Sequence, residues 1–368
     1  MNYKKLIILP LFLLIPVFVF AQADSAPKDA FFKAEVIEIT EQKTTILPDG
    51  AETEQQNLIL RGLEGAFKDK EINFNGIGEI DVINKNIYRV GDRVLAVASF
   101  DAEGNAAYYI TDYVRTKGLW WLAIAFALTL IVVGRGKGAR SLLALALTFL
   151  VIIKYIIPQI LAGTSPLIIT LIGSIIILLI IIYATEGFCA RSHIAFISIL
   201  FSLIIAILLS WFFVSLTKLT GVTSEEASFL LYIGEQAVNF KGLLLAGIII
   251  GALGVLDDVV ISQVAAVEQI AIANSGFRSK ELFKRAYKVG VSHIASMTNT
   301  LFLAYAGVSL PLLIVFISGT SAFSSWGQVV NNEQIATEIV RTLAGSIGLI
   351  LSVPIATFIA AWRYGAKE

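Results

Sequence analysis

Two adjacent carboxylates, Asp257 and Asp258, interrupt an otherwise apolar stretch of the chain, GALGVLDDVVISQ. An ionised aspartate at the centre of a bilayer costs about 2.5–3.5 kcal/mol on insertion scales, so such residues usually line a polar cavity and have a functional role. Neighbouring carboxylates also oppose each other's ionisation. We therefore predict that the pair forms a relay that binds and releases a proton or a cation.

The glycines of the same stretch predict how it packs. At about 100° per residue, one helix face carries Gly247, Gly251, Gly254, Asp258 and Ser262. Small residues allow a neighbouring helix to approach closely, and we expect such a helix to bury the aspartate face. The alternative is that both carboxylates are simply hydrated at the inner membrane boundary, since Asp257 lies about 22 Å beyond Gly242 in a core about 30 Å thick.

The next apolar stretch supplies polar side chains, namely His293, Ser296, Asn299 and Thr300. Hydrogen bonds from Asn299 and Thr300 to either aspartate would satisfy groups that are costly to leave bare in lipid. His293 would carry protons at the cytoplasmic mouth. An ordinary interfacial histidine and plain helix–helix hydrogen bonding are the alternative roles.

The elements that hold these residues read as membrane helices. Of the 368 residues, 57% are hydrophobic and 15% charged, with a mean hydropathy of +0.79, whereas soluble domains are about 45–50% apolar and about 25% charged. Apolar stretches of bilayer length predict about seven transmembrane helices. They cover residues 119–134, 141–157, 166–184, 194–216, 242–262, 294–317 and 340–362.

A different composition precedes these helices. Residues 1–23 have a basic start, an apolar run and an A-x-A site, which predicts a signal peptide cleaved after Ala23; an uncleaved anchor is the alternative. Residues 24–117 predict a small exported, β-rich, barrel-like domain with an OB-like topology and without a catalytic constellation. Its short strands are Ala34–Ile39, Asn57–Leu60, Arg93–Phe100 and Ala107–Tyr113. The chain as a whole is thus a mainly α-helical polytopic membrane protein, with its helical domain at 118–368.

Loop charges predict the orientation. With the barrel outside, the outside loops hold little beyond Lys218 and Lys241. The inside loops hold Arg135, Lys137, Arg140, Arg191, Arg278, Lys280, Lys284, Arg285, Lys288, Arg363 and Lys367. The positive-inside rule therefore places the C-terminus in the cytoplasm of a bacterium, with the chain in its plasma membrane.

Two connecting segments read as amphipathic helices. Thr223–Phe240 is expected to lie at the outer interface, and Phe277–Lys288, with Ser279 as its cap, on the anionic inner leaflet. Solvated linker helices are the alternative for both. Pro311 is expected to kink the helix predicted at residues 294–317.

Several function classes are excluded by composition. The one cysteine, Cys189, and two histidines predict no disulfide, no metal site and no cofactor. The 28 basic and 28 acidic residues balance, so nucleic-acid binding is not expected. Adjacent aspartates point about 100° apart and do not easily share one attacking water, so we expect no enzyme.

The chain resembles the YibE/F-like family of bacterial polytopic membrane proteins. The resemblance rests on Gly251–Gln263, on Val289–Leu313 and, more loosely, on Tyr88–Val97 and Asp112–Arg115. A fainter similarity is to one half of an RND exporter or of SecD/SecF, in which a paired aspartate relays protons and which Asp257 and Asp258 match. This chain departs from both in having one exported domain, no second half-repeat and no obvious intramembrane lysine that would pair with the aspartates.

These features together predict an ion-coupled transporter or export factor driven by protons or monovalent cations. A single-half protein of this kind is expected to act as a homo-oligomer or with a paralogous membrane partner, in the lipid bilayer. The alternative is a non-transporting scaffold or accessory subunit, whose exported barrel binds an envelope partner.

Overall fold

The computed structural model describes residues 30–46, 52–77, 87–100, 106–223, 227, 239–318 and 325–366. The predicted signal peptide and nearly all of the outer segment Thr223–Phe240 lie outside these residues. The chain forms two compact units, Met1–Leu128 and Thr129–Glu368. Each unit has its own hydrophobic core.

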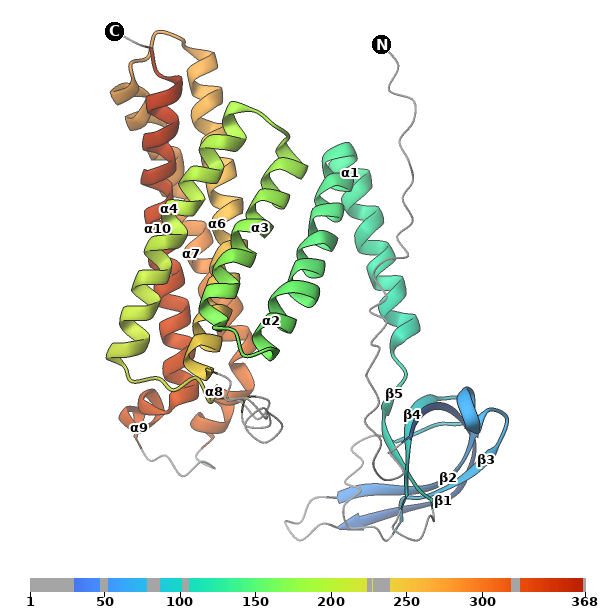
Figure 1. Cartoon of the computed structure of the whole chain (residues 1–368). Coiled ribbons are helices and arrows are strands. Elements are labelled where there is room, and N and C mark those ends of the chain that lie inside the picture. Colours follow the sequence, from blue (N-terminus) through green and yellow to red (C-terminus); the bar gives the residue numbers. More distant parts are fainter. Residues whose placement is uncertain are drawn as a thin grey trace, which may run out of the picture. The chain divides into compact units, whose positions relative to one another are not determined.

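The N-terminal unit is built on one antiparallel sheet in the order β3-β2-β1-β4-β5. Its strands are β1 (Ala30–Ile46), β2 (Glu52–Gly62), β3 (Glu71–Asn75), β4 (Arg93–Phe100) and β5 (Ala106–Tyr113). Figure 1 shows the sheet curling into a half-barrel, and among the described residues no ladder joins its edge strands β3 and β5. The four strands named from the sequence are confirmed. The OB-like topology remains a prediction.

Alternating side chains explain why this sheet curls around a core. In β3 the buried residues are Ile72 and Phe74, with exposed residues between them, as the two-residue period of a strand requires. The buried Gln56 side chain accepts a hydrogen bond from Tyr88 N at 2.7 Å and donates one to Tyr88 O at 3.1 Å. This pair satisfies the backbone of Tyr88 beside the core, where an unpaired polar group would be costly.

The second unit is a helical bundle in which α3, α4, α6, α7 and α10 run side by side (Figure 1). The helices of the chain are α1 (Thr116–Val151), which begins within the first unit, and then α2 (Ile157–Leu161), α3 (Pro166–Glu186), α4 (Ala190–Leu216), α6 (Phe240–Ala273), α7 (Ser279–Val308), α8 (Leu310–Ile317), α9 (Trp326–Asn331) and α10 (Glu333–Tyr364). A π-helical turn, Ile152–Ile156, joins α1 to α2.

Five described helical segments are long and apolar enough to cross a membrane, or six if α7 and α8 count as one bent span. The first of them, Thr116–Leu161, contains two of the predicted spans, and its backbone leaves helical geometry at Arg135. It therefore consists of two helices that meet at Arg135. The count of seven crossings remains a prediction.

Two predictions concern α7 and α8: a separate basic helix at Phe277–Lys288 and a bend near Pro311. The basic segment Phe277–Lys288 is not a separate helix: α7 continues from Ser279 to Val308, and Arg278, not Ser279, is its N-cap. The expected bend near Pro311 is confirmed, because α7 and α8 meet at 64°. Proline lacks the N–H that would continue the helix and its ring clashes with the preceding turn.

Close contacts between small residues hold α4 against α10. A Cβ added at Gly348 of α10 would lie 2.8 Å from the Cβ of Ala206 of α4. Three buried hydroxyls of α4, those of Ser198, Ser202 and Ser210, donate to carbonyls four residues earlier, as Ser202 does to Ser198 O at 2.8 Å. The α4 surface therefore packs closely while these hydroxyls keep their hydrogen bonds.

Candidate functional site

The two aspartates of α6 have different surroundings. Asp257 is buried, with 8% of its surface exposed, whereas Asp258 is exposed. The Asp257 carboxylate accepts a hydrogen bond from Asp258 N at 3.0 Å. Among the described residues neither aspartate forms an ion pair, and Arg341 of α10 pairs instead with Glu338 at 2.9 Å. Asp257 is thus a buried carboxylate without a cationic partner in the described part of the chain.

The other charges of α6 mark how far the aspartates lie from its ends. Lys241 lies sixteen residues before Asp257, or about 24 Å, and Glu268 lies ten residues after Asp258, or about 15 Å. Besides the two aspartates, Lys241 and Glu268 are the only charged residues of this helix. If Lys241 and Glu268 bracket an apolar core of about 30 Å, both aspartates fall inside that core.

The glycine face expected to pack against a neighbour is largely uncovered within the chain. Gly247, Gly254, Asp258 and Ser262 are exposed, and a Cβ added at Gly247 or Gly254 would meet no atom within 4 Å. Only at Gly251 does a neighbour approach, because an added Cβ would lie 3.2 Å from the Tyr305 hydroxyl. The helix contact expected at Gly247 and Gly254 is therefore not formed among the described residues.

The polar side chains of α7 lie at the depth of the aspartates but do not bind them. α6 and α7 are antiparallel, since Gln263 lies beside Gly290 and Gly251 beside Tyr305. Counting from both contacts puts Asp258 level with residues 295–298 of α7.

None of the hydrogen bonds expected from α7 to the aspartates forms among the described residues. Thr300 donates instead to Ser296 O at 3.1 Å. Ser296, Asn299 and Thr300 are exposed, and His293 is half-buried. The structure thus brings these residues to the right depth but leaves them on the outer side of α7.

One buried polar junction was not predicted. Gln263 of α6 donates to Thr357 Oγ1 of α10 at 2.7 Å and to Ala286 O of α7 at 3.0 Å. Gln263 is almost fully buried, and Gly290 of α7 leaves room for its amide. A glutamine in an apolar stretch was the available signal, although nothing in the sequence pairs it with Thr357.

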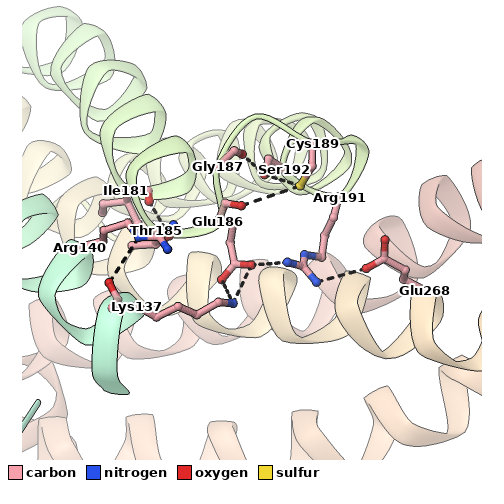
Figure 2. Close-up of polar contacts among 11 residues, drawn as sticks. Lys137, Arg140, Ile181, Thr185, Glu186, Gly187, Cys189, Arg191, Ser192 and Glu268 are labelled. Atoms are coloured by element: carbon pink, nitrogen blue, oxygen red, sulfur yellow. Dashed lines mark hydrogen bonds and ion pairs between the residues drawn. The ribbon is translucent and has the colours of Figure 1, made fainter. Parts of the chain in front are cut away.

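An ion-pair network, also not predicted, joins five helices at one end of the bundle, as Figure 2 shows in part. Glu186 accepts from Lys137 at 3.0 and 3.1 Å and from Arg191 at 2.6 Å. Arg191 also donates to Glu268 at 3.2 Å, and Glu268 accepts from Tyr364 at 3.2 Å. The charges of α1, α3, α4 and α6 and the phenol of α10 thus form one connected cluster.

The loop beside this network carries the chain's one cysteine. Cys189 is half-buried, and its Sγ lies 3.1 Å from Ser192 Oγ, in a hydrogen bond for which either atom can be the donor (Figure 2). The hydrogen bond with the Ser192 side chain, followed by backbone N–H groups at the start of α4 and the Arg191 charge, lowers the pKa of the Cys189 thiol, while partial burial opposes this. Thiolate formation is therefore favoured at this helix N-terminus.

A metal centre has no ready ligand set in the described residues, among which no group of three or more His, Cys, Asp or Glu residues is placed to hold an ion. The carboxylates of Glu186 and Glu268 are paired with Lys137 and Arg191. Asp257 and Asp258 supply only two carboxyl groups.

Comparison with known proteins identifies the helical part of the chain. No curated protein and no solved structure matches it. The RND and SecD/SecF resemblance is therefore supported by no match. A family model described as YibE/F-like protein matches residues 122–366, which is more than half of the chain and includes every candidate residue above. The chain is a membrane protein that belongs to the YibE/F-like family.

Proposed function

We propose that this protein is an ion-coupled transporter or export factor in which Asp257 binds the coupling proton or monovalent cation. The observation that supports this is the burial of Asp257 in an otherwise apolar helix, with no cationic partner among the described residues. A buried carboxylate without a cation is costly, and binding of a proton or a cation removes that cost. Occupancy of Asp257 then changes the packing of the helices around it.

Asp258 has a different role in this proposal. Its carboxylate is exposed and lies next to that of Asp257 in the sequence. It provides the outer step of the relay, from which an ion passes to the buried carboxylate. Because two neighbouring carboxylates disfavour double ionisation, the pair holds one proton or cation more readily than a lone aspartate does.

The proposed orientation follows the loop charges. The network of Lys137, Glu186, Arg191 and Glu268 lies at the inner end of the bundle, with the half-barrel outside the bacterial plasma membrane. Asp257 and Asp258 then lie closer to the inner boundary than to the outer one. The inner network closes the bundle on the cytoplasmic side of the relay.

Chemical labelling tests the central residue. Dicyclohexylcarbodiimide reacts with protonated carboxyl groups in apolar surroundings, so the purified protein should acquire an adduct on the peptide that contains Asp257. The Asp257→Asn variant should lose the adduct. Glu281→Gln removes an exposed carboxylate paired with Arg285 and is the matched control. Equal labelling of the Asp257→Asn variant and the control would contradict the proposal.

Ion flux tests the activity itself. In liposomes that contain a pH-sensitive dye, Asp257→Asn should reduce proton flux at least tenfold, and Glu281→Gln should leave it unchanged. The same comparison is made in a sodium gradient with a sodium dye, which identifies the coupling ion. Full flux in both gradients from Asp257→Asn shows that the carboxylate is not the coupling group.

A second function, as a scaffold whose exported domain binds an envelope partner, is favoured by one feature of the sheet. Phe31, Val97 and Tyr109 lie in register across β1, β4 and β5, and the two aromatic side chains are exposed on the outer face. In this case the half-barrel with one anchoring helix would rescue a deletion strain. Rescue that requires Asp257 favours transport instead.

A further inference from the structure

We propose that a second copy of this chain packs against the exposed faces of α6 and α7 within the membrane and covers Asp258. This interface rests on α6 and α7 crossing the bilayer, and it does not depend on which ion, if any, the aspartates bind. It extends the proposed function, because the aspartate pair becomes part of a site that is exposed in one chain and completed by the second copy.

The α6 side of the face points directly away from the bundle core. Asp258 lies on the opposite side of α6 from Ile249, Leu256 and Val260, which are buried in the core. Above and below Asp258 the exposed residues are Gly247, Gly254 and Ser262. A carboxylate is therefore flanked by small residues on a surface that no other described element covers.

The α7 side of the face also carries exposed polar residues that point away from the bundle core. Asn299 lies on the opposite side of α7 from Gly290, which is buried against Val353 and Gln263. Ser292 and Ser296 are exposed on the same outer side. Since Asp258 is level with residues 295–298, the carboxylate, hydroxyl and amide groups lie at one depth in the bundle.

Between their ends, the exposed surfaces of α3, α4 and α10 are apolar, and this contrast sets the α6–α7 face apart. On α4 the exposed side chains include Phe201, Leu208, Trp211 and Phe212. Such surfaces suit lipid, whereas a carboxylate and an amide are costly to leave in contact with lipid. The α6–α7 face is therefore covered by protein in the membrane.

Hydrogen-bonding chemistry favours a second copy as the covering protein. The Asn299 amide and the Ser292 and Ser296 hydroxyls each donate and accept, and Asp258 accepts, so the face complements itself across a twofold axis. Neither helix presents a lysine or arginine on this part of the face. Gly247 and Gly254 leave the space that a close helix crossing requires, because a Cβ there meets nothing.

Site-directed crosslinking tests the interface. Cys189 is the one cysteine of the chain, so Cys189→Ser gives a background into which Ser296→Cys or Asn299→Cys is introduced. Two differently tagged copies are expressed together, and membranes are treated with a short thiol crosslinker. Both variants should give a product of twice the chain mass that carries both tags. The matched control is Leu208→Cys, on the apolar face of α4, which should give at least tenfold less.

Three outcomes would overturn the proposal. The first is no product at either position, and the second is equal crosslinking at Leu208→Cys. The third is a product that carries only one tag at another mass, which identifies a different partner. The wild-type chain, labelled with one fluorophore in liposomes at low density, gives an independent measurement. It should bleach in two steps, and uniform single steps count against the second copy, whatever the result of the ion-flux experiments.

Discussion

The side-chain amide of Gln263 in α6 donates a hydrogen bond to the hydroxyl oxygen of Thr357 in α10 at 2.7 Å. The same amide reaches Ala286 O of α7, so one buried side chain connects three helices next to the aspartate pair. The Thr357 hydroxyl in turn donates to Val353 O at 2.6 Å. The junction fixes α7 and α10 to the helix that carries Asp257.

Replacing Gln263 by leucine should lower the stability of the bundle. The substitution removes both hydrogen bonds of the amide and leaves Ala286 O without this donor, at a cost of about 1 kcal/mol. We expect a lower Tm in detergent, followed by tryptophan fluorescence. The matched control is Gln269→Leu, an exposed position on the same helix. Equal shifts in the two variants would mean that the junction is not stabilising.

Alanine at Gly290 should destabilise the bundle, even though alanine is the better helix former. Its Cβ would lie 2.4 Å from Val353 Cγ1 and 3.0 Å from both polar atoms of the Gln263 amide. Val353 is buried and the amide is held by two hydrogen bonds, so neither moves freely, and the crowding costs about 1–3 kcal/mol.

The control for Gly290 is Gly345→Ala in α10, where an added Cβ meets nothing within 4 Å. That variant should keep or slightly raise the Tm, because alanine is favoured over glycine in a helix by about 1 kcal/mol. A Gly290→Ala protein as stable as Gly345→Ala would show that α7 can move away from α10.

Neutralising Glu186 should weaken the ion-pair network of Lys137, Glu186, Arg191 and Glu268. Glu186→Gln removes a carboxylate, 13% exposed, that is shared by Lys137 and Arg191, and leaves Arg191 with Glu268 alone. Hydrogen bonds to charged groups of this kind contribute about 1.5–3 kcal/mol. We expect a clear drop in Tm that is little affected by salt. Glu281→Gln breaks an exposed pair with Arg285, so it should lower the free energy of unfolding by less than about 1 kcal/mol and leave the Tm nearly unchanged.

Alkylation of Cys189 should depend on pH in a way that reports its hydrogen bond with Ser192. Because the pKa of the thiol is lowered, the thiolate forms at lower pH than in free cysteine, and iodoacetamide should react faster at neutral pH. Ser192→Ala removes the largest cause of the shift, so its rate profile should move to higher pH. Ser202→Ala, in the middle of α4, should match the wild type. Overlapping profiles for Ser192→Ala and wild type would refute the assignment.

Much of the architecture could be predicted because hydropathy and strand alternation are local properties. The apolar stretches at 166–184, 194–216 and 340–362 became α3, α4 and α10, and the run Arg93–Phe100 became β4 with the predicted limits. Helix continuity was less predictable. The basic residues of Phe277–Lys288 suggested a surface helix, yet α7 runs through them to Val308 because no proline interrupts it.

The sequence by itself determined that this is a membrane protein with two carboxylates inside an apolar helix, because the bilayer demands long apolar stretches whatever their arrangement. Only the tertiary structure decided that Asp257 is buried while Asp258 faces outward, and that Arg191 joins Glu186 to Glu268. These outcomes depend on which faces of separate helices meet. Residues 77 positions apart carry no mutual signal in a single sequence, since only packing of the bundle brings them within hydrogen-bond distance.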